Sequence, residues 1–323
     1  MSNFLKILLF SSIGGLIVGC GTGQQDSGGV KYYSAANDTY YQIESSTTGE
    51  SSVLSITTNG IVTQIPLTPS INGGFVYNTL YKGQNAAGSV LVNNGNMGFT
   101  INSTGGSYFD FASQYVNNNS IPSGTYTTVC DTNNISPCVI NIANNSISIT
   151  EYGQSGVPVS LCTNQPLTLI SANSPNPYLF YFSCGVEGGA TSGKWYIAPL
   201  TINNITGFMI SEFNPAINAN DDGTDELAFP QSSFNPSGTY NYVSYGISTG
   251  VASLSSASFS NGSLNNPTIG SCAGAACAIV PNAFYNFPMV GFSYFSVNGT
   301  VNYNLVGSAG MGLYQDSYQG IYY

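Results

Sequence analysis

Asparagine–glycine pairs stand between short runs of alternating apolar and polar residues at several places in this chain. In VLSITTNGIVTQI, for example, Asn59 and Gly60 separate two such runs. This setting is the strongest short signal for a two-residue β-hairpin loop, because both positions need a positive φ. The alternation on either side is typical of half-buried strands. Four of these pairs are Asn59-Gly60, Asn94-Gly95, Asn261-Gly262 and Asn298-Gly299.

Further strand candidates recur about every 8–12 residues, with turn-forming residues between them. They are rich in tyrosine, valine and isoleucine, which suit a pleated, half-buried surface. The candidates include DTYYQIE, VINIANNSISITEY, YLFYFSC, KWYIAPL and TGFMISEF. Helical patterns are scarce, and the best of them is YFDFASQYV at residues 108–116. The sequence therefore predicts an all-β protein made of antiparallel β-sandwich or barrel modules, two or three of them packed together.

A short repeat suggests where these modules begin. PSGTYTTV at residues 122–129 and PSGTYNYV at residues 236–243 share Pro, Ser, Gly, Thr, Tyr and Val in register. In each copy a Pro-Ser-Gly turn would lead into a strand. Chance similarity is the alternative in a chain so rich in these residue types. The repeat predicts β modules at residues 36–121, 122–235 and 236–323.

The start of the chain has the layout of a secretory signal. Lys6 precedes an apolar run at residues 8–18, which is shorter than the roughly 20 residues of a membrane-spanning helix. The run ends in Ile17-Val18-Gly19-Cys20, which resembles the lipobox of bacterial lipoproteins. The resemblance implies that residues 1–19 are removed as a lipoprotein signal peptide and that Cys20 is acylated as the first residue of the mature chain. A plain signal peptide with a chance cysteine is the alternative.

Residues 20–35 are expected to form a lipidated, flexible tether, because GTGQQDSGG is polar, glycine-rich and without apolar periodicity. Two or three acyl chains would hold the protein firmly to a bilayer, whereas one holds it only marginally. Gly21 follows Cys20 where an aspartate tends to retain enteric lipoproteins at the inner membrane. By that analogy we expect the bacterial outer membrane, with the periplasmic or extracellular face left open.

Six cysteines remain once Cys20 is used for lipid attachment. An exported protein permits disulfides, and six cysteines allow fifteen pairings. Sequence neighbours group naturally, so two disulfides are expected in the second module and one in the third. A zinc or iron–sulfur site is the competing interpretation, but the spacings differ from tight zinc knuckles and the chain has no histidine. The expected pairs are Cys130–Cys138, Cys162–Cys184 and Cys272–Cys277.

Charged residues make up only 6% of the chain, and 14 acidic residues stand against four lysines and no arginine. One of these lysines, Lys6, would leave with the signal peptide. Nucleic-acid binding is excluded on this count, because neutralising phosphates requires a basic face. Binding of anionic lipid head groups through protein charge is equally disfavoured. Contact with the membrane is therefore expected only through the N-terminal lipid.

The sequence offers little for catalysis, and we expect no enzyme. Histidine-based triads and histidine metal sites are impossible without histidine. Two arrangements stay open: a carboxylate pair acting on a glycoside, and a serine–lysine pair. Each candidate is more simply explained as an outward-facing strand residue or a turn residue. The acids are Asp110, Glu151, Glu187 and Glu212, and the pair is Ser192 with Lys194.

An acidic cluster, NANDDGTDE at residues 218–226, resembles the first half of an EF-hand-like calcium loop. Such loops supply oxygen ligands at alternate positions and turn sharply at a glycine. The twelfth position is Phe229, where a bidentate glutamate belongs. A solvated acidic turn is the alternative to a Ca²⁺ site. The candidate ligands are Asn218, Asn220, Asp222, Asp225 and Glu226.

These observations favour a lipid-anchored envelope or cell-surface lipoprotein that acts as a non-enzymatic interaction or structural module. Adhesion, an accessory role in a surface structure, and a coat component all fit this class. Tyrosine-rich surfaces of low charge suit contact with a glycan or protein partner through stacking and hydrogen bonds. The alternatives are a periplasm-facing barrel that binds an apolar ligand, and a carboxylate-dependent enzyme acting on glycosides.

Overall fold

The structure is a computed structural model, and its described residues form strands β1 to β25 in three antiparallel sheets. No helix occurs among these residues. The all-β prediction with antiparallel, barrel-type modules is confirmed. The described ranges are 29–36, 38–45, 52–70, 74–81, 83–93, 95–103, 106–114, 120–131, 136–153, 155–171, 173–184, 193–202, 205–213, 225–233, 237–246, 251–260, 263–265, 278–284, 287–297, 301–307, 311–315 and 318–322.

The first sheet is a closed barrel in which the strands follow one another in chain order. Its strands are β1 (Lys31–Ser34), β2 (Thr39–Ser45), β3 (Ser52–Thr58), β4 (Ile61–Pro69), β5 (Phe75–Tyr81), β6 (Gln84–Asn93), β7 (Asn96–Ser103) and β8 (Gly106–Ser113). The first and last strands pair through Tyr33↔Ser113 and Ser34↔Ala112, which closes the barrel.

The second sheet has the order β12-β11-β10-β9-β17-β16-β15-β14-β13. Its first and last strands along the chain, β9 and β17, are therefore neighbours and pair with each other. Its strands are β9 (Gly124–Asp131), β10 (Ser136–Ala143), β11 (Ser146–Tyr152), β12 (Pro158–Pro166), β13 (Thr168–Leu169), β14 (Phe180–Cys184), β15 (Gly193–Ile202), β16 (Ile205–Phe213) and β17 (Asp225–Pro230). A disulfide between Cys162 and Cys184 links β12, at one end of this order, to β14 near the other end.

The third sheet has the order β20-β19-β18-β25-β24-β23-β22-β21. Its first and last strands along the chain, β18 and β25, pair in the same way. Its strands are β18 (Gly238–Gly246), β19 (Val251–Ser260), β20 (Ser263–Asn265), β21 (Ile279–Phe284), β22 (Phe287–Val297), β23 (Val301–Gly307), β24 (Met311–Gln315) and β25 (Tyr318–Tyr322). An isolated bridge between Ser263 and Ala278 joins the two ends of the order.

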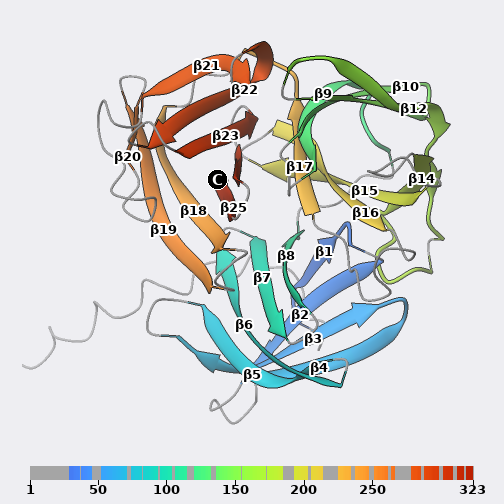
Figure 1. Cartoon of the computed structure of the whole chain (residues 1–323). Coiled ribbons are helices and arrows are strands. Elements are labelled where there is room, and N and C mark those ends of the chain that lie inside the picture. The colour runs from blue at the N-terminus through green and yellow to red at the C-terminus, as the bar shows by residue number, and fades with distance from the viewer. Residues whose placement is uncertain are drawn as a thin grey trace, which may run out of the picture.

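All three sheets are thus up-and-down meanders whose first strand pairs with the last. Figure 1 shows them side by side around a common centre, the first in blue to cyan, the second in green to yellow and the third in orange to red. The two PSGTY copies lie at the same place in their sheets, because Gly124 begins β9 and Gly238 begins β18. In the first copy the Tyr126 hydroxyl donates to the Pro122 carbonyl at 2.9 Å, and burial raises the pKa of Tyr126.

The hairpin prediction is confirmed where the structure describes it. Asn59 and Gly60 have φ angles of 49° and 78° and connect β3 to β4 as a two-residue loop. Asn144 and Asn145, with φ angles of 51° and 58°, make an equivalent loop between β10 and β11. The segment VINIANNSISITEY is therefore two strands, because asparagine also tolerates left-handed φ angles.

The helical pattern at residues 108–116, the best in a chain predicted to be all-β, does not form a helix in its described part, residues 108–114. Most of this segment belongs to β8, which pairs with β7 along its whole length and with β1 at the closure of the barrel. Asp110 and Phe111 are both buried, at 1% exposure each, on opposite faces of the strand. Burial on both faces and ladders on both edges override the local pattern.

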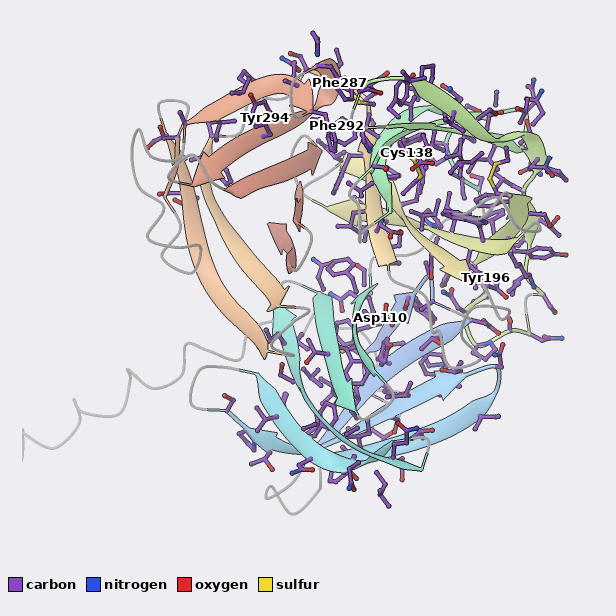
Figure 2. All side chains as sticks on the ribbon, viewed as in Figure 1. Asp110, Cys138, Tyr196, Phe287, Phe292 and Tyr294 are labelled. Atoms are coloured by element: carbon purple, nitrogen blue, oxygen red, sulfur yellow. A yellow bond between two sulfur atoms is a disulfide. The ribbon has the colours of Figure 1, made fainter. Side chains whose placement is uncertain are left out.

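One hydrophobic core is shared by all three sheets, and the first barrel and the second sheet also have interiors of their own. On β15, Trp195 and Ile197 face the interior of the second sheet, whereas Tyr196 and Ala198 face the shared core. The members of the shared core come from residues 35–111, 129–229 and 284–292, with Phe292 of β22 lying where the third sheet meets the second (Figure 2). Because the sheets pack on this common core, their division into separate domains stays a prediction.

Candidate interaction surface

Several predicted site residues lie outside the described ranges, and the structure says nothing of them. They are Cys20, Cys272, Cys277, Glu187, Ser192, Asn218, Asn220 and Asp222. Lipid attachment at Cys20, the third disulfide and most of the calcium loop therefore stay predictions.

The described cysteines form two disulfides between sequence neighbours. Cys130 is bonded to Cys138, with 5.7 Å between their Cα atoms, and joins β9 to β10. Cys162 is bonded to Cys184, with 5.1 Å between their Cα atoms. Both Cα distances are in the normal range for a disulfide. Both disulfides are those predicted from neighbouring positions in the sequence, because each joins two cysteines on strands that are paired or close in space.

The three described candidate carboxylates are divided between two sheets, with Asp110 on the first and Glu151 and Glu212 on the second. Asp110 is inside the first barrel (Figure 2), where Ser34 Oγ donates to its Oδ1 at 2.8 Å and the Tyr41 hydroxyl donates to its Oδ2. Glu151 is on β11 and Glu212 on β16 of the second sheet. Glycoside hydrolysis needs two carboxyl groups about 5–10 Å apart across a bound sugar. Asp110, at 1% exposure, serves instead as a buried hydrogen-bond acceptor.

Lys194 of β15 lies above two tyrosine rings, one on β14 and one on β15. Its Nζ is 4.4 Å from the centroid of the Tyr181 ring and 5.0 Å from that of Tyr196. These are cation–π distances. These contacts hold the Lys194 ammonium group over tyrosine rings at the surface of the second sheet.

The last two predicted calcium ligands, Asp225 and Glu226, lie at the start of β17. Asp225 and Glu226 pair with Ser211 and Ile210 of β16, and Glu226 is buried at 5% exposure. Among the described residues, no group of three or more Asp, Glu or Cys side chains is placed to share a metal ion. A Ca²⁺ site at residues 218–226 stays a prediction.

A polar junction fixes the first barrel against the second sheet. It consists of Ser34, Asp38, Ser174 and Asn176. The Asn176 side-chain amide donates to the Ser34 carbonyl at 2.7 Å, and Asp38 accepts from the Asn176 backbone N–H at 2.9 Å and from Ser174 Oγ at 2.6 Å. Because Asn176 is fully buried and Asp38 nearly so, these bonds are worth more than exposed ones and hold the two sheets in one orientation.

Beside this junction lies a group of partly buried tyrosines, which we call the tyrosine cluster: Tyr33, Tyr40 and Tyr178. Tyr33 and Tyr178 also pack against the shared core. Tyr33 of β1 and Tyr40 of β2 are cross-strand neighbours with ring centroids 6.0 Å apart. The Tyr178 ring, from the loop between β13 and β14, meets Tyr33 edge to face with ring centroids 5.2 Å apart. Lys31 Nζ lies 4.5 Å from the centroid of the Tyr40 ring. Burial, followed by the neighbouring Tyr178 and Tyr40, raises the pKa of Tyr33.

The cluster arises from two tyrosine pairs in the sequence, Tyr32-Tyr33 and Tyr40-Tyr41. Successive strand residues face opposite sides. Tyr32 and Tyr41 accordingly face the interior of the barrel, at 8% and 3% exposure, and Tyr33 and Tyr40 lie on its outer side, with Tyr33 against the shared core. The third ring could not be inferred, because Tyr178 comes from the loop between β13 and β14. Partly exposed tyrosines held in fixed orientations are typical of contact surfaces, since the ring packs while the hydroxyl stays in water.

The interior of the first barrel is filled by its own side chains. Phe99, at 0% exposure, packs against Tyr41 at 5.1 Å and against Tyr77 at 5.8 Å between ring centroids. An apolar ligand bound inside this barrel would have to occupy the space that these three rings take up.

No known protein-family model matches the chain, and no curated protein is significantly similar to it. Within the described ranges, no helix has the length and apolar character needed to cross a membrane.

Proposed function

We propose that this chain is a lipid-anchored bacterial envelope lipoprotein that acts as a non-enzymatic interaction module. The observation that carries the proposal is the tyrosine cluster. Its three rings come from the first barrel and from the loop before β14, and each keeps part of its surface exposed. They are fixed by contacts with one another, by the shared core and by the adjoining polar junction. A surface ordered before binding loses little side-chain entropy when a partner arrives.

The position of the cluster along the chain supports a role close to a membrane. Residues 21–30 separate the predicted lipid-bearing Cys20 from β1, which carries Tyr33. A flexible tether of this length has a root-mean-square span of about 20 Å. With the outer membrane as the expected location, the cluster would face partners within or upon the cell envelope. A glycan or a protein of that envelope fits the low charge of the chain.

The anchor is tested by mass spectrometry of the mature protein. We expect an N-terminal peptide beginning at Cys20 and carrying fatty acids. A Cys20→Ser variant should leave the membrane fraction, because nothing else in the proposal holds the chain there. Recovery of an unacylated mature chain, or of Cys20→Ser in the membrane fraction at the same level, would contradict the anchor.

The interaction is tested by binding of soluble Cys20→Ser protein to isolated cell envelopes. Adding Tyr178→Ala should weaken binding by about tenfold, because a fixed aromatic residue commonly contributes more than 1 kcal/mol to an interface. Tyr294→Ala is the matched control, a partly exposed tyrosine on β22 of the third sheet. Equal binding by both variants and by the parent would exclude the tyrosine cluster as the contact surface.

A further inference from the structure

The second sheet is closed by a strand that changes partners along its length. β12 pairs with β11 through residues 158–166, and after Leu167 the chain continues as β13, which pairs with β14 through Thr168 and Leu169. Beyond these pairs, residues 182–184 of β14 form a ladder with β15 only. In the described part of the chain, no hydrogen bond joins them to β12 on their other side. We call this boundary between β12 and residues 182–184 the seam.

Among the described residues, the disulfide between Cys162 and Cys184 is the one bond that crosses the seam. It joins the middle of β12 to the end of β14 and closes a loop with a sequence separation of 22. The first sheet closes instead through the backbone pairing of β1 with β8, and the ends of the third sheet meet at the bridge between Ser263 and Ala278. The second sheet thus depends on a reducible bond where the other two have backbone pairs.

β12 has little else that holds it against β14. None of its nine residues is buried, and within the strand Leu161 and Cys162 are the residues that pack against the interior of the second sheet. Its ladder with β11 is interrupted at two places. In β14, by contrast, three of the five residues are buried. Without the disulfide, β12 would therefore separate from β14 more readily than β14 would separate from β15.

The seam covers part of the apolar interior of the second sheet. Phe182 and Cys184 belong to this interior, and each is 2% exposed. The Phe182 ring stacks on Trp195 with ring centroids 6.1 Å apart. Trp195, the chain's single tryptophan, is also 2% exposed. Opening of the seam would bring water to these rings, and the fluorescence of Trp195 would report it. Figure 1 shows β12 and β14 at the right-hand side of the second sheet.

We propose that the disulfide between Cys162 and Cys184 is a redox-sensitive lock, whose reduction by a dithiol opens the seam while the rest of the chain stays folded. Opening exposes the apolar interior behind Phe182, so the folded protein has a closed, oxidised form and an open, reduced form. This inference goes beyond the proposed function and does not depend on it, because it requires neither the lipid anchor nor the tyrosine cluster.

The exchange of bonds is that of thiol–disulfide chemistry. Cys162 is partly exposed whereas Cys184 is buried, so a dithiol reaches Cys162 first. A thiolate of the dithiol attacks Sγ of Cys162, the bond to Cys184 breaks, and Cys184 leaves as a thiolate that takes up a proton. The second thiol of the dithiol then displaces Cys162, which leaves as a thiol. The protein gains two electrons and two protons, and the dithiol is oxidised to its own disulfide.

The other described disulfide is a matched control within the same sheet. Cys130 and Cys138 join β9 to β10, and Cys130 is partly exposed, as Cys162 is. The ladder between these two strands extends over residues 124–131 of β9. Loss of this disulfide would leave the two strands held by their backbone hydrogen bonds. Its removal is therefore expected to open no boundary of the sheet.

The test is hydrogen exchange of the soluble Cys20→Ser chain, measured with and without dithiothreitol under native conditions. Alkylation and peptide mapping identify the cysteines that have been reduced. We expect Cys162 and Cys184 to be reduced and exchange at residues 158–166 and 182–184 to become about tenfold faster or more. Removal of the reductant and reoxidation should restore slow exchange.

Two variants separate the two disulfides. Cys162→Ser/Cys184→Ser should show the fast exchange along the seam without any reductant, and acrylamide should quench Trp195 more strongly. Cys130→Ser/Cys138→Ser should change neither measurement. In both variants the amides of β7 in the first barrel should stay protected, because the opening is confined to the second sheet.

The inference is overturned if dithiothreitol leaves Cys162 and Cys184 oxidised in the folded chain, or if their reduction leaves exchange along the seam unchanged. An equal effect of Cys130→Ser/Cys138→Ser would overturn it as well. So would loss of protection in β7 together with the seam, because the disulfide would then stabilise the whole chain. If Cys162→Ser/Cys184→Ser does not fold, reduction of the folded chain decides the question. Acylation of Cys20 and binding to envelopes, which test the proposed function, are measured independently of all these results.

Discussion

Gly291 of β22 is the point at which the packing of the second and third sheets can be tested with a single methyl group. Its φ angle is +90°, and an alanine Cβ here would lie 2.7 Å from Thr127 Oγ1 and 2.9 Å from Thr127 Cγ2. Thr127, on β9 of the second sheet, is fully buried. Both the backbone and the neighbouring sheet therefore require glycine at this position.

The cost of Gly291→Ala follows from two separate effects. A left-handed φ angle costs an L-residue about 1–2 kcal/mol. Forcing a methyl group into a packed core costs about 1–3 kcal/mol more. We therefore expect the free energy of unfolding to fall by about 2–5 kcal/mol. Gly238→Ala is the matched control, because Gly238 has a φ of +100° but no described atom within 4 Å of an added Cβ. Its expected cost is the first effect alone, about 1–2 kcal/mol.

The assay is urea-induced unfolding followed by tryptophan fluorescence, with Thr127→Ala added to each glycine variant. Thr127→Ala removes both atoms that would clash, so it should restore about 1–3 kcal/mol to Gly291→Ala. It should show no coupling with Gly238→Ala. If Gly291→Ala costs no more than Gly238→Ala, or if no coupling with Thr127→Ala is measured, the close contact between the two sheets is refuted.

Three further predictions concern the junction, a disulfide and the tyrosine cluster. Asn176→Ala should lower the free energy of unfolding in urea by about 2–4 kcal/mol, because it removes a buried hydrogen bond and leaves the Ser34 carbonyl without that donor. Asn173→Ala, at an exposed position in the same loop, should change the free energy of unfolding little. Replacing Cys162 and Cys184 by serine should lower the free energy of unfolding in urea by about 3 kcal/mol, as expected for a disulfide that closes a loop of 22 residues. An unchanged unfolding midpoint would contradict a stabilising Cys162–Cys184 disulfide. The raised pKa of Tyr33 means that the folded protein keeps a proton that the unfolded chain loses. Stability should therefore fall as the pH rises above about 10, and the fall measured by thermal unfolding should be smaller in Tyr33→Phe.

Much of the fold could be predicted because its signals are local. Asn59-Gly60 determines its own hairpin, and the alternation on either side of it determines which residues face the barrel. The Asn144-Asn145 loop was missed because its residue pair is a weaker signal for the same turn. The weak helical pattern at residues 108–116 was no guide to the strand, because Asp110 and Phe111 are buried on opposite faces of β8 and the simple alternation is lost.

The surfaces could not be predicted, because they depend on contacts between distant parts of the chain. The bond between Asn176 and Ser34 joins residues 142 positions apart. No pattern near Tyr178 indicates that it meets Tyr33. The short described ladder between β4 and β5 could not be predicted either, because strands of ordinary sequence do not reveal the length of their pairing.

One short strand, β1, connects the stability of this molecule to its proposed function. Tyr33 and Ser34 pair with β8 to close the first barrel, the Ser34 carbonyl accepts the bond from the second sheet, and Tyr33 belongs to the tyrosine cluster. Residues 31–34 of the predicted tether form this strand, so the tether prediction is wrong at its end. Residues 20–30 directly precede β1, so any pull from a lipid anchor would act on β1 first. Loss of binding in a Tyr33→Ala variant could therefore come from an opened barrel. Tyr178 stands outside β1, which makes it the residue at which contact with a partner can be separated from closure of the barrel.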